Sequence, residues 1–367
     1  RRQQSPSRAK FTHMKSRIVV AAFAAACLVA PVAYAQEAAP DADAAPGWFS
    51  HEGAVELTWD HAEDDVDTVA ATVEYALAAR LSKRLTVQAS VVFEPIDEAA
   101  GDSTFEGEGA YLETVTLQYA GDAFTVYGGK FNAVFGSAPD LAPGLYGAEI
   151  GESYEITERV GVGGDVNLAA LAGWSGEHVL SAALFTADRS ALSGSIGTER
   201  PELELADGGP GNTEGLESFA VSFDGALDNG FGYSVGYSQL AAGLPGEADQ
   251  RSLVAGVNYT RAINDKYETD LFAEVASVDG VDGVDGAERT LYTVAGTLRR
   301  DVWHAAAIVS GSSDNDVGGG VDLGQLELSL GRDFDAGVTL DAGVKFIDED
   351  GERSTVVGLR LTFGFGG

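Results

Sequence analysis

The sequence VGLRLTFGF, residues 357–365, is the clearest indication of the fold of this chain. Its odd-numbered residues are apolar or aromatic, and its even-numbered residues are small, polar or charged. Successive side chains of a β-strand point to opposite sides, so the stretch predicts a strand with one apolar and one polar face. Segments of this kind, each followed by a turn, recur about sixteen times along the chain. A chain built almost wholly from them, with aromatics near the strand ends, predicts an all-β fold, a transmembrane antiparallel β-barrel.

The first 46 residues are expected to lie outside the barrel. Met14 is the only methionine, so residues 1–13 are interpreted as an upstream extension. A basic start, a short apolar run and the small-x-small sequence Ala33-Tyr34-Ala35 follow. Together they predict a secretory signal peptide at residues 14–35, with cleavage before Gln36.

A lipoprotein anchor through Cys27 is the rival to that cleavage. Ala24-Ala25-Ala26 is a poor approach to a lipidated cysteine, so we favour the signal peptide. Residues 36–46 are rich in alanine, proline and acidic residues and predict a disordered tether. The barrel domain is then expected to cover residues 47–367.

The charge of the chain excludes one class of partner. The printed sequence has 23 basic and 57 acidic residues, and its formal net charge is −34. Cleavage after residue 35 would remove basic residues and the only cysteine, so the mature chain would be still more acidic and free of disulfides. Nucleic acid is not expected as a partner, because phosphate binding needs a positive surface. Solubility or salt adaptation would explain the acidity equally well.

Alternation and turn residues predict sixteen strands, within about two, because residues 168–178 are ambiguous. Short connections alternate with longer ones rich in glycine and aspartate, which is typical of a barrel with periplasmic turns and external loops. An even strand number places both ends on the periplasmic side. A β-sandwich of this size would need a domain boundary and a β-solenoid a fixed repeat length, and neither is visible.

The closing stretch LTFGF, residues 361–365, and the segment GKFNAVFG, residues 129–136, resemble the outer-membrane porins of Gram-negative bacteria. The resemblance covers the signal peptide and residues 47–367. Porins usually end on the terminal aromatic, whereas Gly366 and Gly367 follow Phe365 here. The family implies an outer-membrane location, contact with membrane lipid and lipopolysaccharide, and insertion by the barrel-assembly machinery. Homotrimers are common among porins of this size, but nothing in the sequence marks an interface.

The third long connection, residues 132–153, is a candidate constriction of the pore. In sixteen-stranded porins the third external loop folds into the lumen, and the resemblance implies the same here. This connection carries Asp140, Glu149 and Glu152 among prolines and glycines that permit tight folding. An ordinary external loop explains the composition as well, and the sequence leaves both readings open.

Facing the apolar side toward lipid turns the other side of each strand toward the lumen. Candidate pore-lining acids are Glu52, Glu56 and Glu74, and candidate pore-lining bases are Arg80, Lys345 and Arg360. A barrel of sixteen strands is wide enough for a water-filled channel, and carboxylates in such a channel favour cations. The same charges could also be solvated lumen groups with no special role.

Enzyme chemistry, cofactors and metal ions are not expected. His61 in the acidic first external loop is the only cluster with a catalytic or ligating character, and a lone histidine there predicts no nucleophile. The repeat of Asp-Gly pairs at residues 278–286 lacks the spacing of calcium loops and predicts an external hairpin tip.

The sequence therefore predicts an outer-membrane porin, a passive diffusion channel for small hydrophilic solutes with a preference for cations. One alternative is a channel specific for a sugar or a metal chelate. Another is a structural or adhesive surface barrel with a plugged lumen, which the long acidic loop at residues 188–215 would support.

Overall fold

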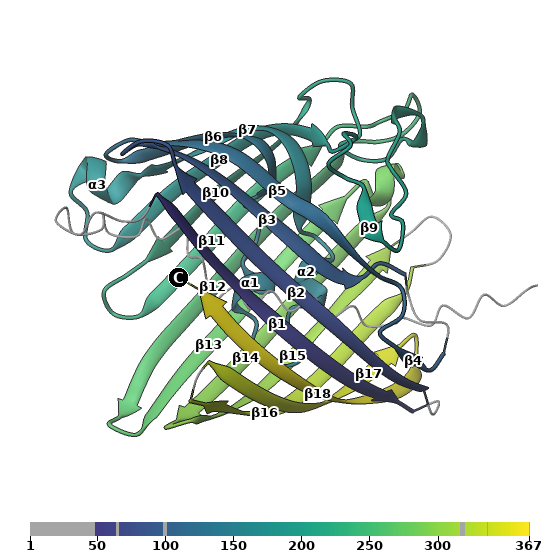
Figure 1. Cartoon of the computed structure of the whole chain (residues 1–367). Coiled ribbons are helices and arrows are strands. Elements are labelled where there is room, and N and C mark those ends of the chain that lie inside the picture. Colours follow the sequence, from purple (N-terminus) through teal and green to yellow (C-terminus); the bar gives the residue numbers. More distant parts are fainter. Residues whose placement is uncertain (1–47, 64–65, 98–100, 316–319, 336, 367) are drawn as a thin grey trace, which may run out of the picture.

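The computed structural model describes residues 48–63, 66–97, 101–315, 320–335 and 337–366. Sixteen long antiparallel strands form one sheet that closes on itself, because β1 pairs with β18 over Glu52–Gly366 to Ala62–Val356. The fold class and the strand number predicted from alternation are confirmed (Figure 1). The predicted upstream extension, signal peptide and tether lie outside the described residues.

The strands of the barrel wall follow one another around the ring in chain order. They are β1 (Phe49–Ala62), β2 (Val66–Arg80), β3 (Leu85–Pro95), β5 (Glu108–Ala120), β6 (Phe124–Ala133), β7 (Ile156–Asn167), β8 (Glu177–Ala187), β10 (Ser218–Ala226), β11 (Phe231–Leu240), β12 (Gln250–Asn264), β13 (Tyr267–Asp279), β14 (Glu288–Arg300), β15 (Trp303–Asn315), β16 (Asp322–Phe334), β17 (Val338–Glu349) and β18 (Glu352–Gly366).

The remaining elements are short and belong to connections. Two small strands, β4 (Ser103–Thr104) and β9 (Ser195–Gly197), add to the sheet near one rim. The helical turns are α1 (Ala138–Leu141), α2 (Glu149–Glu152), α3 (Leu168–Ala172), η1 (Leu205–Asp207) and η2 (Val281–Gly283). The ambiguous stretch after β7 is thus a helical turn followed by a short connection. None of the helices in the described ranges is long and apolar enough to cross a membrane.

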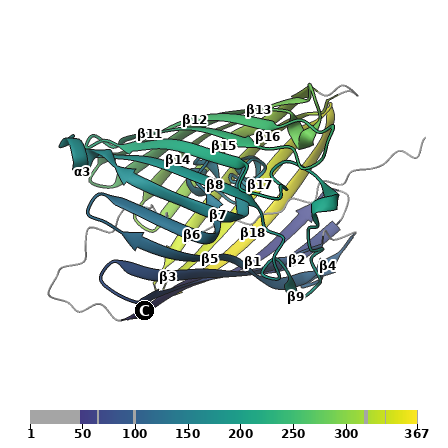
Figure 2. The same ribbon diagram turned by 90° about the horizontal axis from the view of Figure 1, so that it is seen from above.

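The two rims of the barrel differ in the length of their connections. The rim that carries α3 and the end of β18 has mostly short turns, and the opposite rim carries β4, β9 and the longer loops (Figure 2). We call the first the periplasmic rim and the second the external rim. The predicted alternation of short and long connections holds from β2 to β16, whereas the external connections between β1 and β2 and between β17 and β18 are as short as the periplasmic turns.

The alternating pattern places apolar side chains outside. On β16, Leu328 and Leu330 are 48% and 52% exposed, while Glu327 between β15 and β17 is buried within the barrel. The outward side chains of β6, β8, β12 and β14 show the same exposed apolar character. This face is the lipid-facing surface that the sequence pattern predicts, because a spanning barrel needs an apolar outer band.

The buried apolar cluster lies inside the ring. Phe135, Ile150 and Tyr154 come from the connection between β6 and β7, and they pack with inward side chains such as Phe272 and Ile308. The interior is therefore partly filled by one loop, and that loop positions the candidate site.

Candidate functional site: the lumen and loop L3

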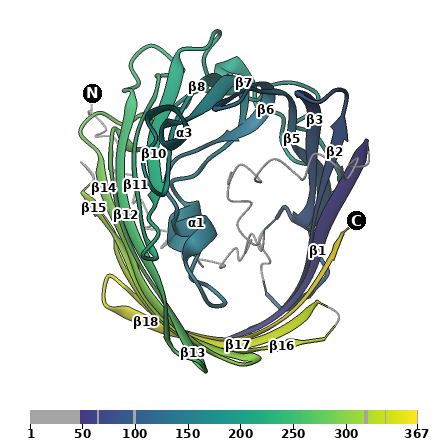
Figure 3. The ribbon, with the colours of Figure 1, turned by 90° about the vertical axis from the view of Figure 1, so that its left-hand side faces the viewer.

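Loop L3, residues 134–155, folds into the barrel. Seen along the barrel from the periplasmic rim, α1 of this loop lies inside the ring of strands (Figure 3). Its polar contacts reach β1, β13, β16, β17 and β18, which are wall strands far from its own stems in the sequence. Of the two readings that the sequence left open for residues 132–153, the structure shows the inward one.

A single carboxylate on β13 ties both ends of L3 to the wall. The backbone N–H groups of Ser137 and Ala138 donate to Glu274, at 2.8 Å each. The hydroxyl of Ser137 donates to the same carboxylate at 2.7 Å, and the hydroxyl of Tyr154 donates to it at 2.5 Å. Glu274 is almost fully buried, so these donors replace the water that an ionised carboxylate would otherwise hold.

The tip of L3 is held by a second buried carboxylate, Glu327 on β16. The N–H groups of Leu145 and Tyr146 donate to it at 2.5 and 3.1 Å. Gly144 precedes them with φ +92°, and a Cβ there would lie 2.4 Å from the carboxylate. Only glycine fits both the backbone and the space. The hydroxyl of Tyr146 reaches on to Asp60 on β1 at 2.5 Å.

Two basic side chains that point inward bind the side of L3 that Glu327 also holds. Lys345 on β17 is 1% exposed, and its ammonium lies 2.6 Å from the carboxylate of Glu149. Arg360 on β18 donates to the carbonyl oxygen of Gly144 at 2.7 Å. Lys345 and Arg360 are therefore both engaged by the loop. They hold L3 in place rather than standing free in the channel.

The other side of L3 carries acids that face more acids. Burial, followed by the charges of Glu155, Glu149, Glu94 and Glu74, raises the pKa of Glu152 to about 9. Burial, then Asp140, Glu113 and Glu74, raises the pKa of Glu155 to about 8. These interactions place the loop acids within electrostatic range of β2, β3 and β5. We call the set Glu74, Glu94, Glu113, Glu152 and Glu155 the acidic eyelet, and its members are all partly exposed.

The nine residues nominated from the sequence fall into three groups. Glu149, Lys345 and Arg360 form the contact between L3 and the wall. Glu74 and Glu152 belong to the acidic eyelet. The rest are Asp140, exposed on α1, Glu56, buried against Thr362 of β18, and Glu52 and Arg80, exposed toward the periplasmic ends of β1 and β2.

Beyond these nine candidates, two further kinds of residue shape the lumen. Glu94, Glu274 and Glu327 follow from strand parity alone, which places them inward, but parity cannot tell a buried anchor from an open pore acid. Parity also places Asp60 inward, but its contact with Tyr146, and that of Tyr154 with Glu274, depend on the path of L3 inside the ring, which no local pattern predicts. Glu155 lies two residues beyond the predicted end of the loop.

A recess of about 570 Å³ lies between L3 and the periplasmic halves of β12–β18. His304 of β15 crosses it, with its Nε2 2.7 Å from the carboxylate of Asp341 on β17. The crossing passes over Gly331 of β16, where a Cβ would lie 1.9 Å from the imidazole. Asp341 is 3.9 Å from Arg360. A polar row therefore links the recess to the tip of L3.

The two other motifs of the sequence lie at the external rim. His61 is 3.1 Å from Asp67, and both side chains are exposed. The Asp-Gly repeat connects β13 to β14 through η2, which is the predicted hairpin tip. Among the described residues there is no group of three or more histidine, cysteine, aspartate or glutamate side chains placed to hold a metal ion.

Of the comparisons with known proteins, the one with solved structures finds matches, and these share the fold. No family model matches the chain, and no curated protein sequence matches it. One similar solved structure is a loop-deletion mutant of OmpT, an outer membrane protein of Vibrio cholerae, at TM-score 0.58 and 12% identity over 86% of this chain and 99% of that one. Another is a multiple mutant of the Rh. blastica porin, at TM-score 0.54 and 15% identity over 86% and 100%.

A closed barrel of sixteen antiparallel strands with an apolar outer band is the class that these observations define. The fold is that of the outer-membrane porin barrels, as the resemblance in the closing stretch implied.

Proposed function

We propose that the protein is an outer-membrane diffusion channel that passes small hydrophilic solutes and prefers cations. The observation that carries the proposal is the asymmetry around L3. The acidic eyelet lies on one side of the loop, and Lys345 and Arg360 are bound to the loop on the other side. No bond is made or broken; solutes are selected by the width of the lumen and by its field.

Carboxylates in a narrow aqueous passage attract counter-ions and repel anions, and their field is stronger where low-dielectric walls limit screening. Lys345 offers little opposing field, because its charge is compensated by Glu149 at 2.6 Å. The fold of outer-membrane porins and the apolar outer band support the membrane location. Membrane lipid, lipopolysaccharide and the assembly machinery are the partners that we propose with it, and a homotrimer is compatible with this proposal.

The test is the reversal potential of the refolded protein in a planar bilayer under a potassium chloride gradient. We expect stepwise current and a cation-selective potential. Neutralising the wall side of the acidic eyelet with Glu74→Gln and Glu113→Gln should move the potential toward zero. The control for each of these substitutions taken singly is Glu352→Gln, which also removes one charge, from an exposed position at the start of β18.

Two outcomes would contradict the proposal. Well-inserted protein without current would favour a plugged surface barrel. If one sugar or one metal chelate saturated the channel at concentrations at which other solutes did not change the current, a substrate-specific channel would be favoured.

A further inference from the structure

The inward path of L3 leaves a gap in the barrel wall. Strand β5 extends over Glu108–Ala120, but β6 pairs with it only from Val115–Lys130 to Ala120–Thr125. Toward the external rim, β6 ends at Ala133 and the chain turns into the lumen. The edge of β5 from Glu108 to Thr114 therefore loses its neighbour on the L3 side. Unpaired edge groups next to lipid are strongly unfavourable, so something must cover them.

A piece of loop L4, which connects β8 to β10, covers the external part of this edge. Strand β9 pairs antiparallel with β5 from Gly109–Gly197 to Tyr111–Ser195, and the N–H of Thr198 donates to the carbonyl oxygen of Glu108 at 3.0 Å. A Cβ on Gly109 would lie 2.8 Å from the carbonyl oxygen of Thr198. The close approach of L4 therefore requires glycine at this position. We call residues 195–200 the strap.

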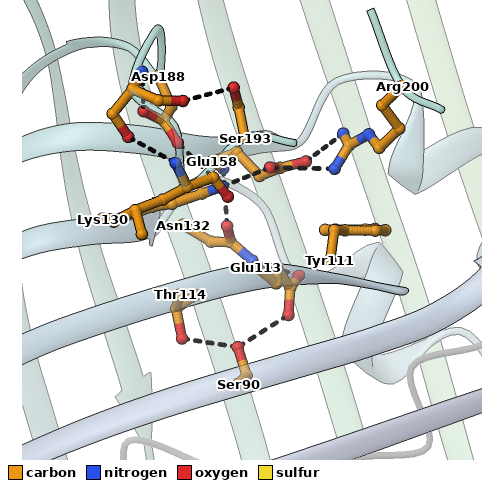
Figure 4. A network of polar contacts seen from close by, with 12 residues as sticks. Ser90, Tyr111, Glu113, Thr114, Lys130, Asn132, Glu158, Asp188, Ser193 and Arg200 are labelled. Atoms are coloured by element: carbon orange, nitrogen blue, oxygen red, sulfur yellow. Dashed lines mark hydrogen bonds and ion pairs between the residues drawn. The ribbon is translucent and has the colours of Figure 1, made fainter. Parts of the chain in front are cut away.

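Arg200 ends the strap and binds the second stem of L3. Its guanidinium makes two hydrogen bonds to Glu158 at the start of β7, at 2.5 and 3.2 Å, and lies 3.9 Å above the ring of Tyr111 on β5 (Figure 4). A bidentate pair combined with stacking fixes both the position and the angle of the side chain. Arg200 therefore joins β5 and β7 across the gap.

Glu158 is the meeting point of the network. It holds φ +52°, and its second contact is the ammonium of Lys130 at 2.7 Å. Lys130 is 1% exposed and is also 2.9 Å from Asp188, the first residue of L4. The first stem of L3 is tied in as well, because Asn132 donates to Glu113 of β5 at 2.9 Å and accepts the N–H of Glu158 at 2.9 Å.

We propose that Arg200 is a positioning residue, and that the strap it ends closes the wall gap and holds the two stems of L3 in register. This inference rests on the proposed function, because its readout is the current through the channel. The anchors Glu274 and Glu327 hold L3 against the far wall. The strap fixes the point from which L3 leaves, and hence the position of Glu155, which lies only three residues before Glu158.

The test compares single-channel recordings of Arg200→Gln with those of the unchanged protein. Loss of one charge-assisted bidentate contact changes an equilibrium by about tenfold. We therefore expect the fraction of time spent in reduced-current states to rise by about that factor. The matched control is Arg353→Gln, which breaks an exposed ion pair between Arg353 of β18 and Asp348 of β17 and should leave the recordings unchanged.

A reversible cross-link separates positioning from general damage. In a chain with Cys27→Ser, Ala110→Cys and Ile196→Cys place thiols on neighbouring positions of β5 and β9. A short bifunctional thiol reagent should return Arg200→Gln to steady current, and reduction should restore the fluctuation. If Arg200→Gln does not insert, Gly109→Ala, which pushes the strap away from β5, should show the same fluctuation.

The outcomes are distinct. Steady current in Arg200→Gln, or fluctuation that persists after cross-linking, would overturn the proposed role of Arg200 and the strap in positioning L3. Absence of current in every variant, including the unchanged protein, would instead overturn the proposed channel.

Discussion

The two sides of loop L3 use the same residue type for opposite purposes. On the side that touches β13–β18, the carboxylates of Glu274 and Glu327 are buried, and donors of the loop converge on them. On the side toward β2–β5, Glu152 and Glu155 keep partial exposure and face further carboxylates. The difference shows that a lumen acid acts as an anchor or as a pore charge according to its partners. The first side is called the locked face and the second the open face.

The largest expected effect comes from exchanging one acid for its amide on each face. Glu274→Gln turns an NH₂ group toward the donors of Ser137, Ala138 and Tyr154, and leaves buried donors without an acceptor. We expect a loss of about 3 kcal/mol in the free energy of unfolding. Glu152→Gln on the open face should not lower it, because the raised pKa of Glu152 makes the ionisable carboxyl unfavourable in the folded state at neutral pH and the amide removes that cost. Urea unfolding in detergent, followed by the heat-modifiable gel shift, measures both, and similar losses would remove the distinction between the faces.

A smaller effect is expected when the cation of the locked face is removed. Lys345→Met leaves Glu149 without its ammonium, and we expect a loss of about 2 kcal/mol at pH 8. Burial raises the pKa of Glu149, and Lys345 is the main group that lowers it.

The pH dependence of that loss follows from the sign of the shift. Without Lys345, the folded pKa of Glu149 lies further above its unfolded value. The folded variant then binds the proton more tightly than the unfolded chain, so its stability falls as pH rises above the unfolded pKa. The deficit of Lys345→Met relative to the unchanged protein should therefore be smaller at pH 5 than at pH 8. A deficit that grows toward pH 5 would contradict the buried pair.

Much of the architecture could be predicted from the sequence, because alternation is a local property. The parity of residues 357–365 is enough to place Arg360 inward, and the same rule places Lys345, Glu56 and Glu74. Parity predicts whether a side chain points inward or outward, but it does not predict which residues that side chain contacts. The contact of Lys345 with Glu149 joins residues 196 positions apart, and it exists only because L3 turns inward. The strap could not be predicted from the sequence either, because the pairing of Ser195–Gly197 with β5 depends on the gap that L3 leaves in the wall.

The smallest effect, and the sharpest test of the open face, is the pH dependence of ion selectivity. Burial and neighbouring acids raise the pKa of Glu152 to about 9 and that of Glu155 to about 8. Both groups are then mostly protonated at pH 6 and mostly ionised at pH 10. Cation selectivity, measured as the reversal potential in a fixed potassium chloride gradient, should therefore increase between these two values.

The variant with Glu152→Gln and Glu155→Gln should lose most of this increase while its conductance persists, because the wall acids Glu74, Glu94 and Glu113 remain. A locked-face variant such as Lys345→Met does not remove either titrating group and should keep the increase. Were the unchanged protein to give one potential across the whole range, the loop acids would not face the permeating ions. The open face would then be a second, weaker contact surface, and selectivity would have to arise from the wall acids alone.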